Sequence, residues 1–127
     1  MRRSSTVLTA LLALLVAGCA SADPGPARVA GAFSVAVDHG RWEQACGLLS
    51  QQARDGVETG GRTCASALEE LRLPGGAPRE ARVFGDEAQV RLAGDTVFLH
   101  RFGDLWRVHA AGCEPRAGLP YRCEIGG

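Results

Sequence analysis

GDEAQVRLAGDTVFLHRFGD, residues 85–104, decides the fold of this chain of 127 residues. The stretch contains three Gly-Asp pairs, which begin at residues 85, 94 and 103 and so recur every nine residues. Gly followed by Asp favours a two-residue type II′ turn, because Gly tolerates a positive φ at the first turn position. Three such turns predict a meander of four antiparallel strands over 79–84, 87–93, 96–102 and 105–111.

Tight turns also predict the register of the strands. Counting outward from the turns pairs Leu92 with Val97, Val90 with Leu99, Leu99 with Val108 and Val97 with Ala110. One face is then apolar and should form the core: Val83, Ala88, Val90, Leu92, Val97, Leu99, Trp106, Val108 and Ala110. The other is polar with aromatic residues: Arg82, Phe84, Gln89, Arg91, Phe98, His100, Phe102, Leu105, Arg107 and His109. One extra residue in a loop would swap the faces beyond it.

Helical periodicity precedes the strands. Apolar residues recur at helical spacing in two segments: Val29, Phe33, Ala36 and Val37, then Trp42, Ala45, Cys46 and Leu49. Ser50 is a predicted N-cap of a short helix that reaches Val57, and Thr63 is a predicted N-cap of a helix that ends before Pro74. We therefore expect an α+β domain over 28–127, with N-terminal helices packed on a curved antiparallel sheet of four to five strands.

The N-terminus has the pattern of a secretory signal. A basic start, Arg2 and Arg3, is followed by an apolar stretch over 7–17 that is too short to span a bilayer. Val16-Ala17-Gly18-Cys19 resembles the lipobox of bacterial lipoproteins. The resemblance implies that cleavage follows Gly18 and that Cys19 carries a lipid. The alternative is an ordinary signal peptide with an incidental cysteine.

Lipidation of Cys19 would divide the chain into a signal peptide (1–18), a lipidated tether (19–27) and the domain (28–127). Several acyl chains on one residue make attachment to a membrane stable. Pro24, Gly25 and Pro26 are expected to prevent regular structure in the tether. The expected location is the extracytoplasmic face of the cell membrane, with membrane lipid as a partner through Cys19.

Four cysteines remain after Cys19, an even number that suits disulfide formation in an oxidising compartment. Three pairings are possible, and we favour Cys46 with Cys64 and Cys113 with Cys123, because each closes a short loop. A metal site is the alternative, but the chain lacks the closely spaced C-x-x-C pairs that zinc sites use. We expect neither a metal nor a cofactor.

Charge argues against nucleic acid as a partner. The chain has 14 basic and 14 acidic residues, and removal of residues 1–18 takes away Arg2 and Arg3. The mature chain would then be slightly acidic, with no basic stripe that could neutralise phosphates.

The order of the elements, helices and then an antiparallel meander, resembles the nuclear transport factor 2-like cone fold, which includes SnoaL-like proteins. The resemblance also rests on Phe98-Leu99, Trp106-Arg107-Val108 and the segment Ala110-Ala111-Gly112-Cys113. It implies a helix-covered sheet, often dimeric, and relatives that are isomerases, cyclases, ligand carriers or interaction domains. Catalytic relatives place an acid or base inside the cone, but the predicted core face contains no carboxylate, so we assign no catalytic residue.

Two groups of residues are candidate sites. The polar face offers a partner or homodimer surface of Phe84, Phe98, His100, Phe102, Leu105, Arg107 and His109. The segment 115–123, closed by the second disulfide, is an alternative cover for part of that face. A small cavity beside Trp42, Arg101 and Trp106 is the second site, with Arg101 stacked on Trp106, and a shared core is its alternative.

The sequence as a whole therefore predicts a membrane-anchored lipoprotein that acts as a non-catalytic binding or assembly module. One alternative is a carrier of a small apolar ligand in the cone. The other is an isomerase- or cyclase-like enzyme that uses His100 or His109.

Overall fold

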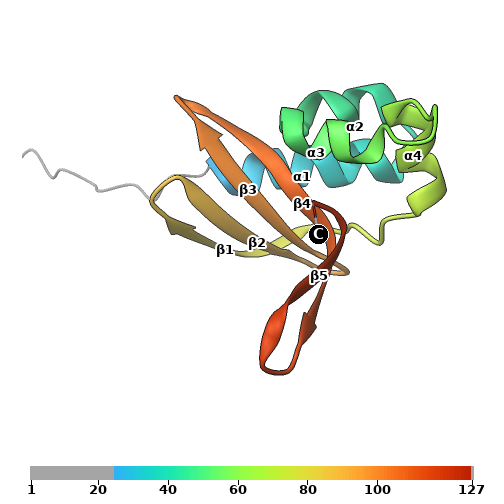
Figure 1. Cartoon of the computed structure of the whole chain (residues 1–127). Helices are drawn as coiled ribbons and strands as arrows, with labels where there is room; N and C mark the ends of the chain where they lie inside the picture. Colours follow the sequence, from blue (N-terminus) through green and yellow to red (C-terminus); the bar gives the residue numbers. More distant parts are fainter. Residues whose placement is uncertain (1–24, 127) are drawn as a thin grey trace, which may run out of the picture.

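A computed structural model describes residues 25–126 and confirms the α+β class: four helices precede five strands (Figure 1). The helices are α1 (Gly25–Asp38), α2 (Trp42–Leu48), α3 (Gln51–Val57) and α4 (Cys64–Leu71). The strands are β1 (Pro78–Phe84), β2 (Glu87–Leu92), β3 (Thr96–Phe102), β4 (Leu105–Arg116) and β5 (Leu119–Ile125). They form one antiparallel sheet in the order β1-β2-β3-β4-β5.

Helix α1 begins earlier than the predicted start of the domain at residue 28. Gly25 is its first residue and Pro26 is buried, so residues 25–27, which the sequence placed in the tether, belong to a helix. Proline is tolerated in the first helical turn because its missing N–H has no partner there in any case. Cys19, the signal peptide and the rest of the predicted tether lie outside the described residues.

The two predicted N-caps are confirmed. The Ser50 hydroxyl accepts a hydrogen bond from the Ala53 N–H at 3.1 Å, and the Thr63 hydroxyl accepts one from the Ser66 N–H at 3.2 Å. Each cap satisfies a backbone donor that the helix itself leaves without a partner.

Two of the three predicted turns are confirmed. Phe84 pairs with Glu87 across the β1–β2 turn, and Phe102 pairs with Leu105 across the β3–β4 turn. Gly85 has a φ of 62° and Gly103 has a φ of 61°, which is the value that the first central position of a type II′ turn requires.

The β2–β3 turn corrects the predicted register. Val90 pairs with Val97 instead of Leu99, and the Leu92 N–H donates to the Asp95 carbonyl at 2.8 Å. The central turn residues are therefore Ala93 and Gly94, one position earlier than predicted. The observed register of β2 against β3 differs from the predicted register by two residues. Because side chains alternate with a period of two, every side chain keeps its predicted face.

The segment before β1 explains where this turn lies. The Ala93 N–H donates to the Ala77 carbonyl and the Gly94 N–H to the Gly75 carbonyl, each at 2.9 Å. Two N–H groups of the turn thus donate to a neighbouring segment, which fixes residues 93 and 94 at the centre of the β2–β3 turn.

A bulge in β4 corrects the second predicted pairing. Leu99 pairs with Val108 as predicted, but Phe98 pairs with Ala110, so His109 is an extra residue on β4. Val97 therefore does not meet Ala110. Ala110 and the next residue, Ala111, are both buried, at 6% and 0% exposed.

Helix α1 packs across the predicted core face of the sheet, and α3 contacts β4 and β5 (Figure 1). Eight of the nine residues assigned to that face are buried, and Val83 is the exception, at 42% exposed. Val83 lies near the turn end of the edge strand β1, whereas α1 packs against the start of that strand, where Gly31 lies beside Pro78.

Two disulfides close the domain in the favoured pairing. Cys46 of α2 is bonded to Cys64 of α4, and Cys113 of β4 to Cys123 of β5. The free side of β4 is covered near Val108, where Leu49 forms a parallel bridge and the Ser50 N–H donates to the Val108 carbonyl at 2.8 Å. Residues 25–126 contain no helix long and apolar enough to cross a bilayer.

Candidate binding sites on the outer face of the sheet

The outer face, which we define as the sheet face opposite α1, carries the predicted partner surface. The structure divides that surface into an exposed part and a covered part. Phe84, Phe102 and Leu105 are 65%, 51% and 58% exposed. Phe98, His100, Arg107 and His109 are only partly exposed, because each contacts a neighbouring segment.

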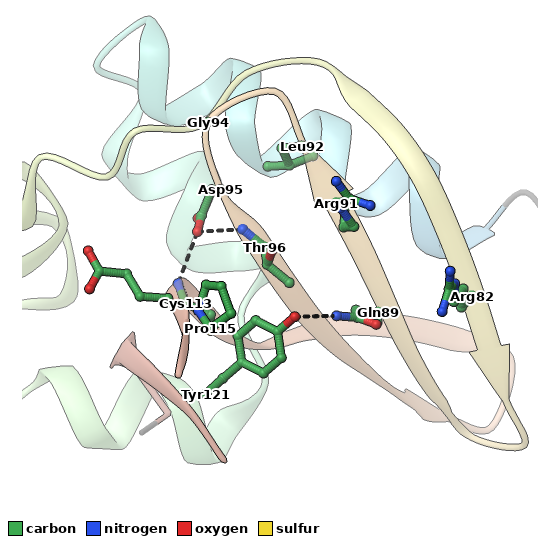
Figure 2. Close-up of a pocket in the computed structure, with 11 residues that line it drawn as sticks. Arg82, Gln89, Arg91, Leu92, Gly94, Asp95, Thr96, Cys113, Pro115 and Tyr121 are labelled. Carbon is green, nitrogen blue, oxygen red and sulfur yellow. Dashed lines mark hydrogen bonds between the residues drawn. The ribbon is translucent and has the colours of Figure 1, made fainter. Parts of the chain in front are cut away.

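Phe98 is covered by the C-terminal strand. The Tyr121 ring of β5 lies edge-on against the Phe98 ring, with centroids 5.1 Å apart. The Tyr121 hydroxyl also accepts a hydrogen bond from the Gln89 amide at 3.2 Å (Figure 2). The segment 115–123 therefore covers part of the outer face, which is the alternative that the sequence left open.

The two histidines have different partners. His109 Nδ1 and the Ser50 hydroxyl lie 3.0 Å apart, so the bulged residue is joined to the cap of α3. His100 Nδ1 contacts a carboxylate oxygen of Glu87, whose side chain is 60% exposed. His100 also packs on Phe102, with ring centroids 4.6 Å apart. Both histidines are thus held by neighbours at the protein surface.

The residues of the predicted cavity lie in or beside the core. Trp106 is 5% exposed and Trp42 packs against the same buried cluster. The Arg101 guanidinium lies 5.4 Å from the Trp106 ring, as the cross-strand pairing predicts, and donates to Asp86 Oδ1 from Nε and Nη2 at 2.9 and 2.7 Å. None of the three lines either of the two clefts described next.

The first cleft, which we name the Tyr121 cleft, has a volume of about 520 Å³. It lies between the β4–β5 hairpin and the outer face of β1–β3 (Figure 2). Its lining is mostly polar: Arg82, Gln89, Arg91, Leu92, Gly94, Asp95, Thr96, Cys113, Glu114, Pro115 and Tyr121. Figure 2 shows Arg82 and Arg91 on one side of Tyr121 and Asp95 on the other.

Glu80 holds the arginine side of the cleft. Arg82 Nε donates to Glu80 Oε1 at 2.9 Å, and Arg91 Nη1 donates to Glu80 Oε2 at 3.2 Å. The hydrogen bond from Arg82 is the largest cause that lowers the pKa of the Glu80 carboxyl, followed by the Arg82 charge. Both arginine side chains remain more than 60% exposed.

Asp95 joins two parts of the backbone. Its Oδ1 accepts from the N–H groups of Thr96 and Cys113 at 2.7 and 3.0 Å, and its Oδ2 accepts from the Gly112 N–H at 2.9 Å. Burial raises the pKa of the Asp95 carboxyl, and these three hydrogen bonds act in the opposite direction. Since both oxygens are occupied, Asp95 fixes the β2–β3 turn to β4.

The second cleft, which we name the hairpin cleft, lies between the α2–α3 junction and the β3–β4 turn, with a volume of about 550 Å³. Its sheet side consists of Phe102, Leu105 and Arg107. Arg107 Nη1 donates to the Gly47 carbonyl at 2.6 Å; this acceptor is neutral, so the contact does not balance the positive charge of the guanidinium. The remaining lining comes from the helices: Cys46, Gly47, Leu49, Ser50, Gln51, Gln52 and Arg54.

Sequence reasoning missed the residues that form the Tyr121 cleft. Gln89 and Arg91 were assigned only to a polar face, Asp95 only to a turn, and Tyr121 only to a covering segment. The Cys113–Cys123 bond was the available signal, because a disulfide across a hairpin shows that the segment between the two cysteines folds back.

Within residues 25–126, no three His, Cys, Asp or Glu side chains are grouped so that they could hold a metal ion. Comparison of the chain with protein-family models, with curated proteins and with solved structures finds no match.

Proposed function

We propose that the chain is a lipoprotein, anchored through Cys19 on the extracytoplasmic face of the cell membrane, whose domain is a non-catalytic binding module. The lipobox resemblance supports the anchor. The two disulfides support an oxidising compartment, because cytosolic proteins rarely keep such bonds. Helices that cover one face of an antiparallel meander support the nuclear transport factor 2-like cone.

We further propose that the Tyr121 cleft binds the anionic group of a small polar ligand. The observation that carries this proposal is the convergence of Arg82 and Arg91, from adjacent strands, on the single carboxylate of Glu80. Solvent screens these exposed ion pairs, so a ligand carboxylate or phosphate can replace Glu80 at small cost. Guanidinium groups suit such anions because they donate two parallel hydrogen bonds.

The rest of the cleft supports binding over catalysis. Tyr121 and Gln89 supply neutral hydrogen-bonding groups next to the arginines. The Asp95 carboxylate already accepts three backbone hydrogen bonds, and His100 and His109 are not part of the lining. The cleft therefore offers groups that hold a ligand, while its most buried carboxylate has a structural task.

The anchor is tested with the Cys19→Ser variant. The wild-type protein should fractionate with membranes and show the mass of a chain that begins at an acylated Cys19. The variant should be released from membranes. A wild-type protein of unmodified mass in the soluble fraction would contradict the anchor.

The cleft is tested by thermal unfolding, followed by the fluorescence of Trp42 and Trp106, with citrate and inorganic phosphate as probes. A ligand that binds only the folded state raises the melting temperature as its concentration rises. The rise should exceed that in sodium chloride of equal ionic strength and disappear in Arg82→Gln/Arg91→Gln. Arg79→Gln is the matched control, since Arg79 is an exposed β1 arginine outside the cleft. Equal rises in all three proteins would exclude the site.

A further inference from the structure

The end of the sheet that carries the β1–β2 and β3–β4 turns has an unusual surface. Phe84, Phe102 and Leu105, which we name the apolar tip, are each more than half exposed. Phe102 and Leu105 are direct cross-strand neighbours, and Phe84 is separated from them on the same face by the Glu87–His100 pair. We propose that the apolar tip rests on the lipid bilayer. This inference depends on the proposed anchor.

The position of α1 directs the tip towards the anchor. The C-terminal half of α1 lies at the opposite end of the sheet, where the Ser34 hydroxyl donates to the Gly76 carbonyl at 2.9 Å and Gly76 lies against Ala93 of the β2–β3 turn. From Ser34 back to its first residue, Gly25, the helix extends for about 14 Å. Figure 1 shows its first residues on the same side of the molecule as the two turns of the apolar tip.

The length of the connection limits the distance between the domain and the membrane. Gly25 lies six positions after Cys19 in the sequence. Even a fully extended chain of this length spans only about 20 Å. An acylated Cys19 would therefore keep the start of α1, and the end of the sheet beside it, close to the bilayer surface.

Tethering makes a small contact sufficient. Three side chains alone are a small apolar area for a stable complex between free partners, but a tethered contact forms at high effective concentration. Aromatic and aliphatic side chains favour the interface between lipid headgroups and acyl chains. The tether holds the tip at the bilayer itself, whereas a second copy would have to diffuse to it along the membrane, so the bilayer is the favoured occupant.

Charges of both signs surround the tip: Asp104 is exposed in the β3–β4 turn and Glu87 contacts His100, so only part of this surface suits anionic lipid. Asp86 of the β1–β2 turn is neutralised by Arg101, which donates to it twice. Arg107 lies beside Phe102 and Leu105 in the hairpin cleft and keeps its positive charge. A cationic group next to apolar side chains attracts anionic headgroups.

The test uses the full acylated protein in vesicles of phosphatidylethanolamine and phosphatidylglycerol. Because the other cysteines are acylated or in disulfides, a new cysteine in Asp104→Cys can be labelled selectively with an environment-sensitive fluorophore. Lipids with a spin label near the headgroup should quench this fluorophore. The same fluorophore on Leu119→Cys is the matched control, since Leu119 is 60% exposed but lies at the β4–β5 turn, away from α1 (Figure 1).

The expected result is quenching at position 104, little at position 119, and loss of the quenching at 104 when Phe84→Asp, Phe102→Asp and Leu105→Asp are combined with the label. The triple variant should still sediment with vesicles through its acyl chains, and its circular dichroism should show that it is folded. Equal quenching at both positions, or none at 104 in sedimenting protein, would overturn the proposal. A dimer in detergent, together with no quenching of the fluorophore at position 104 by the labelled lipids, would show that a second copy covers the tip. That result would also overturn the proposal. If instead the anchor itself is absent, the protein will have its unmodified mass and will not sediment with the vesicles.

Discussion

Tyr121 of β5 lies edge-on against Phe98 of β3, with 5.1 Å between the ring centroids, and this contact holds the β4–β5 hairpin over the outer face of the sheet. Tyr121 also forms one wall of the Tyr121 cleft. Two strands that are not hydrogen-bonded to each other are thereby joined by their side chains.

Tyr121→Ala should lower the free energy of unfolding by about 1–2 kcal/mol, because it removes both the apolar contact and the aromatic pair. Tyr121→Phe keeps the ring and loses only the hydrogen bond with Gln89, so it should cost less than about 1 kcal/mol. Urea unfolding measures both values. Equal stability of Tyr121→Ala and the wild type would show that the hairpin is held in place by the sheet and the disulfide alone.

Asp95→Asn should lower the free energy of unfolding at neutral pH by about 1–3 kcal/mol. An amide cannot accept all three backbone hydrogen bonds, and a buried donor is then left without an acceptor. Asp104→Asn is the matched control, because Asp104 occupies an exposed turn in another Gly-Asp pair. Its effect should stay within about 0.5 kcal/mol of zero.

The pH dependence of Asp95 has a defined sign. Burial raises its pKa in the folded state, so the folded protein binds the proton more tightly than the unfolded chain does. The stability that comes from this titration is fully present at acid pH and is lost as the pH rises through the raised pKa. An NMR titration of the Asp95 carboxyl should therefore give a midpoint above the usual aspartate value.

Glu80 should titrate in the opposite direction. Arg82 and Arg91 lower the pKa of its carboxyl, so the stabilisation is present above the usual glutamate pKa and is lost as the pH falls through the lowered value. Arg82→Gln should move the NMR titration midpoint of Glu80 upward, because it removes the hydrogen bond and the charge that cause most of the shift. An unchanged midpoint would mean that the Arg82–Glu80 pair does not persist in solution.

Each disulfide should stabilise the domain by about 3 kcal/mol in the chain-entropy description. The larger effect is expected for Cys46→Ser/Cys64→Ser, because that bond joins residues 18 apart in sequence, against 10 for the other. Cys113→Ser/Cys123→Ser should in addition weaken the effect of citrate on the melting temperature, since Cys113 lines the Tyr121 cleft. Urea unfolding of the two double variants measures the stability terms, and a larger loss for the 113–123 pair would contradict the ranking.

The sequence predicted the sheet because the constraints on its strands are local. Gly85 and Gly103 impose their turns through backbone conformation, and the β2–β3 turn could differ by two residues without moving Val90 or Leu99 to the other face. Counting residues from the turns could not predict the bulge at His109, since the partner of His109 is Ser50, which is 59 residues away in the sequence. The exposure of Val83 likewise depends on where α1 ends its contact with β1.

The site was less predictable than the fold for a related reason. The Tyr121 cleft depends on how far the β4–β5 hairpin curls over the sheet, and no alternation of apolar and polar residues encodes that distance. Arg82, Gln89 and Arg91 have the composition of an ordinary solvated face. Only their position under Tyr121 turns that face into the wall of a cleft.

The first residues of β1 would have a consequence if the proposed anchor holds the protein in the plane of a membrane. Pro78 lacks a backbone N–H, and the pairing with β2 is irregular at Arg79, between Pro78 and Glu80. Neighbouring molecules in a crowded membrane collide far more often than molecules in dilute solution. An unbroken row of backbone donors on an edge strand would let them pair strand to strand and form fibres. The interrupted row on β1, with the charges of Arg79 and Arg82 beside it, makes this edge a poor template for such growth.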